Sequence, residues 1–319
     1  MTVISQGSVR VSAEVAEAVK TGQAIVALES TIFTHGLPRP VNLEVAQEAE
    51  SILRELGVVP ATVGIIRGLP VVGMTQDEIA DLSREDSVVK VSRRDLPIAA
   101  TKKLNGGTTV AATAFLAHHA GIRVFSTGGL GGVHHGASET FDESADLSIL
   151  AETPVLLISA GVKSILDIPA TLERLETLSV TVVGYKTTTY PGFYVRDSGS
   201  RIEYSAASPD EAAAILAAQD SFGIQSAVLI ANPVAEDQQL SPSLHTRILS
   251  EAWKAAAADS VSGNATTPYL LDYIQRATGG ESLSVNINVY RGNVRLGGEI
   301  ALAFTRRASI ARLPQPALG

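Results

Sequence analysis

Short apolar segments alternate with amphipathic helical segments along most of the chain. The sequences AIVAL (24–28), RVFST (123–127) and PVLLISAG (154–161) have the length and the apolar, partly β-branched composition of buried strands. The segment 41–56 carries apolar residues at helical spacing and is followed by Gly57, which favours a helix end there. Strands that alternate with helices build a parallel sheet that is covered on both faces. We therefore predict an α/β protein with three layers, α/β/α, and a largely parallel central sheet.

We expect residues 1–319 to form a single domain. The chain is long enough to bury a large core, and no internal repeat or low-complexity tract divides it. The polar stretch 196–209 is the best candidate for an internal boundary. After it the sequence predicts a helix, the strand SAVLIANP (226–233) and three further helical segments.

The composition excludes several classes of function. A net charge of −8 and a pI near 5.3 argue against a nucleic-acid-binding surface but allow a local basic pocket for a phosphate. The absence of cysteine excludes disulfides, thiolate metal ligands and cysteine nucleophiles, and it is simplest in a cytoplasmic protein. The N-terminal segment lacks the apolar core of a signal peptide, and no apolar run reaches the roughly 20 residues that cross a bilayer. We expect a soluble, cytoplasmic protein that binds neither nucleic acid nor membrane.

Several residues with useful chemistry follow the predicted strands. Glu29, Lys90, the glycine-rich stretch after Thr127 and Lys163 all lie at or near predicted strand ends. In parallel α/β sheets, ligands bind beyond the carboxyl ends of the strands. We therefore expect these residues to converge on one site.

Lys163 is the candidate nucleophile of that site. It follows the strand 154–161 and begins a predicted helix that runs to Leu175. A lysine partly withdrawn from water loses proton affinity, so its amine can attack a carbonyl carbon and form a Schiff base. The alternative is a solvated lysine at a helix N-terminus, where its charge is mildly disfavoured.

Three carboxylates accompany this lysine. Glu29 comes directly after the first strand, and it is a general acid if its surroundings raise its pKa; otherwise it caps a turn or pairs with a base. Asp142 and Asp146 are four residues apart, so a helix that begins near Phe141 would place both on one face. Both could bind Mg²⁺ or Mn²⁺, one could bind the metal while the other exchanges protons, or both could be ordinary helix N-terminal acids.

The glycine-rich stretch TGGLGGVHHG (127–136) allows two interpretations. It lacks the acid that a dinucleotide fingerprint needs about 20 residues later, so it forms either a backbone anion site or a tight loop. His134 and His135 are adjacent and cannot both point the same way from a strand, which argues against a zinc pair. One of the two could still donate to a phosphate or a substrate.

Two further segments supply groups for an anion. Lys90, Arg93 and Arg94 provide local positive charge for a phosphate, or they form ordinary ion pairs with Asp95. NGGTT (105–109) leads into a predicted helix whose first backbone amides could bind an anion. Neither segment decides the function alone.

Taken together, these segments resemble one known family, pseudouridine-5′-phosphate glycosidase, which is also associated with indigoidine-synthesis gene clusters. The motifs occur in consistent order from about Val11 to Ala303, which argues strongly against a chance match. The segments that carry the resemblance are ALESTIFTHGLPRP, GVVPATVGIIRG, KVSRRDL, NGGTTVAAT, FSTGGLGGVHHGASETFDESADL, ISAGVKSILD, TPYLL and GGESLSVNI.

The resemblance implies the reversible cleavage of pseudouridine 5′-phosphate to uracil and ribose 5-phosphate. The bond that breaks joins two carbon atoms, so protonation of a leaving oxygen or nitrogen cannot break it. An imine between a lysine and C1 of the ring-opened sugar would act as the electron sink that lets carbon depart. The family also implies Mn²⁺ as cofactor, a homotrimer and the three-layer fold. Some relatives carry a fused sugar-kinase domain, which we do not expect here.

The resemblance also assigns roles to individual residues. Lys163 would be the nucleophile, and Glu29 would be the proton donor that helps to open the ribose ring. Asp146 would contact the substrate and is the candidate for proton exchange at the uracil carbon. Asp142 would bind Mn²⁺, with water in most of the other coordination positions. The other substrate-binding residues that it implies are Lys90, Val110, Thr127, His134, Ser144, Ala145 and Asn286.

Two other functions remain open. A Schiff-base aldolase or lyase that acts on another pentose phosphate would use the same lysine but accept no uracil. A phosphosugar-binding module would use the lysine and the carboxylates only to hold its ligand. The combination of Lys163 with Glu29, Asp142 and Asp146 argues against the module, because binding alone needs no pairing of amine and acid.

Overall fold

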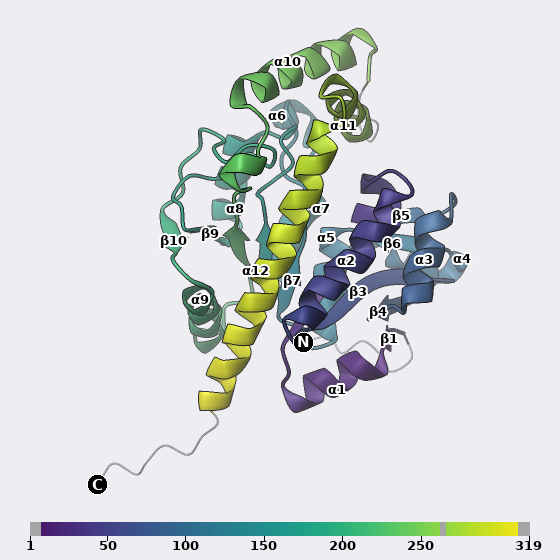
Figure 1. The fold of residues 1–319 in the computed structure, drawn as a ribbon, viewed down its shortest axis with the longest axis vertical. Coiled ribbons are helices and arrows are strands. Elements are labelled where there is room, and N and C mark those ends of the chain that lie inside the picture. The colour runs from purple at the N-terminus through teal and green to yellow at the C-terminus, as the bar shows by residue number, and fades with distance from the viewer. Residues whose placement is uncertain (1–7, 262–265, 312–319) are drawn as a thin grey trace.

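The computed structural model describes residues 8–261 and 266–311, which form one central sheet with helices on both faces (Figure 1). The strands follow the order β1-β4-β3-β2-β7-β8-β11-β9-β10, and β6 and β5 join the sheet beside β3. Within the described residues, the paired strands are parallel except for β3–β4 and β3–β6. The predicted three-layer fold with a largely parallel sheet is confirmed.

The elements alternate along the chain as the sequence predicts. The strands are β1 (Arg10–Val11), β2 (Ile25–Leu28), β3 (Val59–Ile66), β4 (Leu69–Val72), β5 (Val89–Val91), β6 (Gly106–Thr108), β7 (Val124–Ser126), β8 (Leu156–Ser159), β9 (Thr181–Tyr185), β10 (Tyr204–Ala206) and β11 (Val228–Ala231). The helices are α1 (Ala13–Thr21), α2 (Val41–Glu55), α3 (Gln76–Arg84), α4 (Leu96–Lys102), α5 (Val110–His119), α6 (Ala137–Thr140), α7 (Ala145–Leu150), α8 (Ile168–Thr177), α9 (Pro209–Ser221), α10 (Pro242–Ala258), α11 (Thr266–Ala277) and α12 (Glu281–Ala311).

Strand β2 divides its side chains between two hydrophobic cores. Ile25 and Ala27 belong to the core that includes residues of α1, α5 and α7. Val26 and Leu28 belong to the opposite core, with residues of α2, α9 and α12. Successive side chains of a strand point to opposite faces, so this alternation requires apolar layers on both sides of the sheet. The continuous apolar run AIVAL therefore fits the most buried part of the fold.

Two helical regions bear directly on function. Helix α12 lies across one face of the sheet, contacts β2, β7 and β8, and packs against α2 and α9 (Figure 1). Helices α10 and α11 pack against each other at one end of the molecule (Figure 1). Although α12 has 31 residues, no helix in 8–261 or 266–311 combines the length and apolarity that a membrane crossing needs.

Two expectations about elements are wrong. The stretch 196–209 is not a boundary, because it contains β10, which extends the sheet by pairing with β9. The helix expected to begin at Lys163 begins instead at Ile168, where Asp167 caps it by accepting a hydrogen bond from the Ala170 amide at 3.0 Å. Lys163 therefore lies in a turn between β8 and α8. The expectation of a single domain over the whole chain stays a prediction.

Candidate active site

The carboxyl ends of three neighbouring parallel strands form the centre of the candidate site. In the sheet, Leu28 of β2 pairs with Ser126 of β7, and Ser126 pairs with Ile158 of β8. Glu29 and Thr127 follow directly at this edge, and Lys163 follows four residues after β8 ends. The expected convergence of these strand ends is confirmed by the topology.

The first part of the glycine-rich stretch extends the β7–β8 pairing and so positions Lys163. The Ala160 amide donates to the Gly128 carbonyl at 2.9 Å, and the Leu130 amide donates to the Gly161 carbonyl at 3.0 Å. The Lys163 amide then donates to the Leu130 carbonyl at 3.1 Å. These bonds fix the backbone of the lysine against the stretch. The start of the glycine-rich stretch is therefore hydrogen-bonded to the segment that carries Lys163 and is not a separate loop.

Glu29 has the surroundings of a proton donor. The residue is only 6% exposed, and its carboxylate accepts hydrogen bonds from the hydroxyls of Thr31 and Thr127. Burial raises the pKa of Glu29, because a carboxylate is poorly solvated there. The two hydroxyls and the nearby Lys163 oppose this rise but do not cancel it. Glu29 therefore keeps its proton to a higher pH than an exposed glutamate does.

Lys163 has the surroundings of an amine nucleophile. Burial lowers its pKa, and the positive charge of Lys90 lowers it further. Glu29 and Asp146 act in the opposite direction, because their negative charges favour the ammonium form. The side chain keeps intermediate exposure, so a ligand can reach the amine. The structure thus favours the nucleophile over the solvated lysine.

The Asp146 carboxylate binds to backbone amides of both predicted anion sites, the glycine-rich stretch and the start of the helix after NGGTT. One carboxylate oxygen accepts from the Ala111 amide of α5 at 2.9 Å, and the other accepts from the Gly131 amide at 2.8 Å. The side chain is 7% exposed, so these bonds hold a buried acid in one orientation beside Lys163. Only glycine fits at 131, because a Cβ there would lie 2.1 Å from the Ser144 hydroxyl oxygen. The amides at 111 and 131 therefore bind an anion, but it belongs to the protein.

The other predicted substrate contacts occupy different positions around this centre. Val110 is buried and begins α5, next to Ala111. Ser144 caps α7 by accepting from the Asp146 amide at 3.2 Å, and Ala145 is exposed at the first position of that helix. These residues lie close to the site because each is next to Asp146 or to Ala111, which donates a hydrogen bond to Asp146.

Lys90 and Asn286 reach the site from more distant elements. Lys90 is exposed on β5, yet its charge lowers the pKa of Lys163. Asn286 belongs to α12, and its Oδ1 would lie 3.6 Å from a Cβ placed on Gly128. Arg94 forms the ion pair with Asp95 that the alternative interpretation predicts, whereas Arg93 pairs with Glu152, which was not predicted.

His134 and Asp142 form a more exposed, separate part of the site. The His134 amide donates to the Asp142 carbonyl at 3.0 Å, and His134 Nδ1 lies 3.9 Å from Asp142 Oδ2. The Asp142 side chain is 46% exposed. The prediction that Asp142 and Asp146 share a helix face is wrong, because α7 begins only at Ala145.

The two adjacent histidines have different partners, as expected. His135 Nδ1 lies 3.8 Å from Asp167 Oδ2, on the α8 side, whereas His134 faces Asp142. In the part of the chain that the structure describes, no group of three or more histidine, aspartate or glutamate side chains forms a metal cluster.

Asn293 of α12 is a site residue that the sequence did not indicate. Its side-chain amide donates to the carbonyls of Thr127 and Gly128, at 2.8 and 3.2 Å, and its Oδ1 accepts from Asn232 at 2.9 Å. The side chain is 1% exposed and lies three residues after the buried Tyr290, on the apolar side of the helix. A buried amide on an apolar helical face is the signal that could have identified it. Asn293 anchors the start of the glycine-rich stretch.

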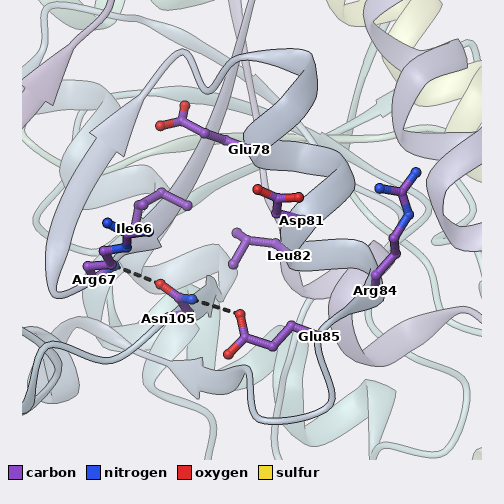
Figure 2. A pocket seen from close by; sticks show the side chains of 8 residues that line it. All are labelled: Ile66, Arg67, Glu78, Asp81, Leu82, Arg84, Glu85 and Asn105. Atoms are coloured by element: carbon purple, nitrogen blue, oxygen red, sulfur yellow. Dashed lines mark hydrogen bonds between the residues drawn. The ribbon is translucent and has the colours of Figure 1, made fainter.

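A separate hollow of about 640 Å³ lies away from these residues, beside the β3–β4 turn and α3 (Figure 2). Among its lining residues, Asn105 accepts from the Arg67 amide and donates to Glu85, both at 2.7 Å (Figure 2). None of the predicted site residues lines it. We therefore assign the chemistry to the strand ends and not to this hollow.

An α/β sheet with a partly buried amine beside buried acids at its strand ends defines a class of proteins suited to covalent chemistry on a small ligand. Residues 14–303 match the family described as "Indigoidine synthase A like protein", and the chain belongs to this family. This confirms the resemblance seen in the sequence motifs.

Known relatives cover nearly the whole chain. The pseudouridine-5′-phosphate glycosidase of Saccharopolyspora erythraea is 59% identical to it, over 92% of this chain and 97% of the relative. The protein of the same name from Frankia alni is 49% identical, over 95% of this chain and 84% of the relative. The crystal structure of the prealnumycin C-glycosynthase AlnA in complex with ribulose 5-phosphate has a TM-score of 0.90 and 33% identity, over 96% of this chain and 100% of that chain.

Proposed function

We propose that the chain is an enzyme that reversibly cleaves the C–C glycosidic bond of pseudouridine 5′-phosphate to give uracil and ribose 5-phosphate. The observation that carries this proposal is the placement of Glu29 and Lys163 after β2 and β8, the strands on either side of β7, with the pKa of the amine lowered and that of the acid raised. Relatives at 59% and 49% identity bear the name of this activity, and the structural neighbour AlnA binds a pentose phosphate.

The chemistry needs an amine as well as an acid. The neutral Lys163 amine forms a bond to C1 of the sugar while the bond from C1 to the ring oxygen breaks, and Glu29 gives its proton to that oxygen. The nitrogen, which carries an extra proton after the attack, gives that proton to Asp146, and its freed lone pair forms a C1=N iminium as the bond between C1 and the uracil carbon breaks. The uracil carbon takes a proton, for which Asp146 is the candidate exchange group. Water then hydrolyses the iminium, which releases ribose 5-phosphate and restores the amine.

The remaining residues bind and orient the substrate. Asp146 is held by two backbone amides, so its position is fixed before substrate arrives. Lys90 supplies a positive charge for the phosphate and also keeps Lys163 closer to its neutral form. Further contacts are assigned to Val110, Thr127, His134, Ser144, Ala145 and Asn286.

Mn²⁺ is part of the proposal, with Asp142 as its protein ligand. A hard divalent ion can bind through one carboxylate and keep most of its water, so an exposed side chain without an arginine or lysine partner among the described residues fits it. When bound, the ion would supply positive charge to orient and polarise substrate oxygens. Other divalent cations would suit the same oxygen donor.

Two further expectations belong to the same proposal. A homotrimer rests on the family resemblance, and a cytoplasmic location rests on the cysteine-free composition. Sedimentation of the purified protein would test the first.

The direct test is synthesis from the products. Uracil, ribose 5-phosphate and Mn²⁺ are incubated with the protein, and pseudouridine 5′-phosphate is measured by chromatography with mass spectrometry. We expect product that depends on the protein and on all three components. No product from folded protein would favour the Schiff-base aldolase or lyase, which would still bind the sugar phosphate. Testing the protein for formation of prealnumycin probes a C-glycosynthase activity such as that named for AlnA.

A further inference from the structure

Each carboxylate oxygen of Glu29 has its own hydroxyl partner. Thr127, which follows β7, donates to Oε1, and Thr31, two residues after Glu29 in the chain, donates to Oε2. The two partners differ in exposure, because Thr127 is 0% exposed whereas Thr31 keeps intermediate exposure. Oε2 is therefore the carboxylate oxygen on the more open side, where a substrate can approach the acid.

The backbone after β2 turns so that Thr31 reaches back to the carboxylate. Residues Ile32–Gly36 form one π-helical turn, and Thr31 is the residue that precedes it. Such turns are rare and often lie at functional sites. The Ser30 carbonyl accepts from the Thr34 amide at 3.0 Å and from the Thr34 hydroxyl at 2.9 Å, and the Ser30 hydroxyl accepts from the Thr108 amide of β6 at 2.8 Å. These bonds fix the residue before Thr31 on both sides, so the hydroxyl of Thr31 is held in place.

The hydrogen bond from Thr31 strengthens when Glu29 gives up its proton. A hydrogen bond to an ionised acceptor is roughly twice as strong as one between neutral groups. The bond is therefore stronger after the proton has left than before, which is the kind of interaction that accelerates a reaction. The gain matters here because Glu29 is only 6% exposed, so water cannot solvate the carboxylate that remains.

Charged and titratable groups from other elements also act on Glu29. Burial is the largest influence on the pKa of Glu29 and raises it, and the charge of Asp146 raises it further. The two hydroxyls and the charge of Lys163 oppose this rise. Tyr290 of α12 stays neutral, because burial and the negative charge of Glu29 both raise its own pKa. Loss of the Thr31 hydroxyl should therefore raise the pKa of Glu29 further and make it a weaker acid.

We propose that Thr31 is a positioning residue of the ring-opening step, whose hydroxyl holds the proton-donating oxygen of Glu29 and stabilises the carboxylate left behind. This inference rests on the proposed function, in which Glu29 is the acid of that step. The O–H bond of Glu29 breaks and an O–H bond forms at the sugar ring oxygen, as the bond from C1 to that oxygen breaks. Thr31 keeps its own proton and its hydrogen bond to Oε2 throughout.

Three substitutions on the same turn test the role of the hydroxyl. Thr31→Val removes it with little change in shape, so turnover should fall about tenfold and the alkaline limb of the pH–rate profile should move to higher pH. Thr31→Ser keeps a hydroxyl and should restore both quantities. Thr34→Val is the matched control, because Thr34 has the same intermediate exposure but its hydroxyl donates to the Ser30 carbonyl. It should keep the alkaline limb of the unmodified protein.

A titration without substrate separates this inference from the proposed function. The C=O band of a protonated carboxylic acid that disappears in Glu29→Gln reports the proton on Glu29, and difference infrared spectra follow it with pH. In Thr31→Val this band should persist to higher pH than in the unmodified protein, whereas in Thr31→Ser and Thr34→Val it should titrate as in the unmodified protein. An unchanged titration in folded Thr31→Val, or equal shifts in Thr31→Val and Thr34→Val, would overturn the role of Thr31 even in protein that cleaves pseudouridine 5′-phosphate.

Discussion

The start of the glycine-rich stretch, residues 127–131, and the segment 134–142 that follows it differ in strand pairing, in hydrogen bonding and in exposure. Residues 127–131 continue the β7–β8 pairing, bond to the backbone of Lys163 and are held by Asn293. Residues 134–142 leave the sheet, contain the short helix α6 and end at an aspartate whose side chain is 46% exposed. Only Gly132 and Val133 separate the two segments in the sequence, and the glycine-rich stretch reaches into the second segment as far as Gly136. Only the first is built into the sheet edge where the amine and the acids meet.

This difference suggests separate roles for the two segments in the proposed reaction. Rigid, buried positions preserve the orientation of catalytic groups and shift their pKa values. Exposed positions keep their water and suit a hydrated cation or the edge of a substrate. We therefore expect substitutions around 127–131 and Lys163 to reduce turnover strongly, and substitutions around 134–142 mainly to alter the requirement for metal.

The largest effect is expected for Lys163→Ala. Loss of the nucleophile should reduce turnover at least about a thousandfold. The fold should persist, since partial burial already disfavours the ammonium form of Lys163, and the melting temperature should not fall. Steady-state kinetics and thermal unfolding measure both quantities. Lys102→Ala, at an exposed position of α4, is the control. Wild-type-like turnover of Lys163→Ala would refute the assignment.

Glu29→Gln should reduce turnover about a hundredfold, because a positioned general acid contributes that much or more. The raised pKa of Glu29 means that the protonated, active form persists to a higher pH, and that turnover falls as the pH rises through this pKa. The variant has no such titration, so the alkaline limb of its pH–rate profile should flatten. Glu44→Gln, exposed on α2, should keep the profile. An unchanged alkaline limb in Glu29→Gln would assign that limb to another group.

Asn293→Ala tests whether the first part of the stretch depends on its anchor. Loss of the two bonds to the carbonyls of Thr127 and Gly128 should destabilise the fold by about 1–3 kcal/mol. It should also reduce kcat about tenfold with little change in KM, because the strand ends shift relative to Lys163. Asn288→Ala, on the same helix but partly exposed, is the matched control. A loss of stability with unchanged kcat would leave Asn293 a purely structural residue.

Asp142→Asn should have the smallest effect on turnover at saturating metal. The Mn²⁺ concentration for half-maximal activity should rise about tenfold, while kcat at saturation changes only slightly. Glu139→Gln, exposed in α6, should leave the metal requirement unchanged. If Asp142→Asn shows the same Mn²⁺ dependence as the unmodified protein, the metal ligand lies elsewhere.

Much of the fold follows from local patterns. The apolar runs of β2, β7 and β8 and the helical spacing of α2 require a sheet that is covered on both faces, and the strand order then brings Glu29, Thr127 and Lys163 together. Thr75 and Glu78 form the capping box that begins α3, as the sequence TQDE indicates. These features depend on residues that are close in sequence, so periodicity and caps were enough to predict them.

The two wrongly predicted helix starts, near Phe141 and at Lys163, lie where a capping residue further along the chain sets the true start. Phe141 has a positive φ of 57°, which ends α6 and prevents a continuous helix through Asp142. Ser144 then starts α7, and Asp167 with Pro169 starts α8 well after Lys163. Each start carries a recognisable cap that outweighed the apolar spacing.

The supporting contacts of the site could not be predicted from local sequence. The amides at 111 and 131 that bind Asp146, and the carbonyls that Asn293 holds, belong to segments from 15 to 166 residues away from their partners. Such pairs depend on the finished topology, and no spacing in the sequence encodes them. The identity of the acids was predictable, but the groups that orient them were not.

The most direct test of the central claim is reductive trapping at Lys163. The protein is incubated with ribose 5-phosphate, treated with borohydride and digested, and its peptides are analysed by mass spectrometry. An iminium between Lys163 and the sugar would be reduced to a stable amine, so we expect the peptide containing Lys163 to gain the mass of the reduced sugar phosphate. Unmodified Lys163 in protein that turns over pseudouridine 5′-phosphate would contradict the account.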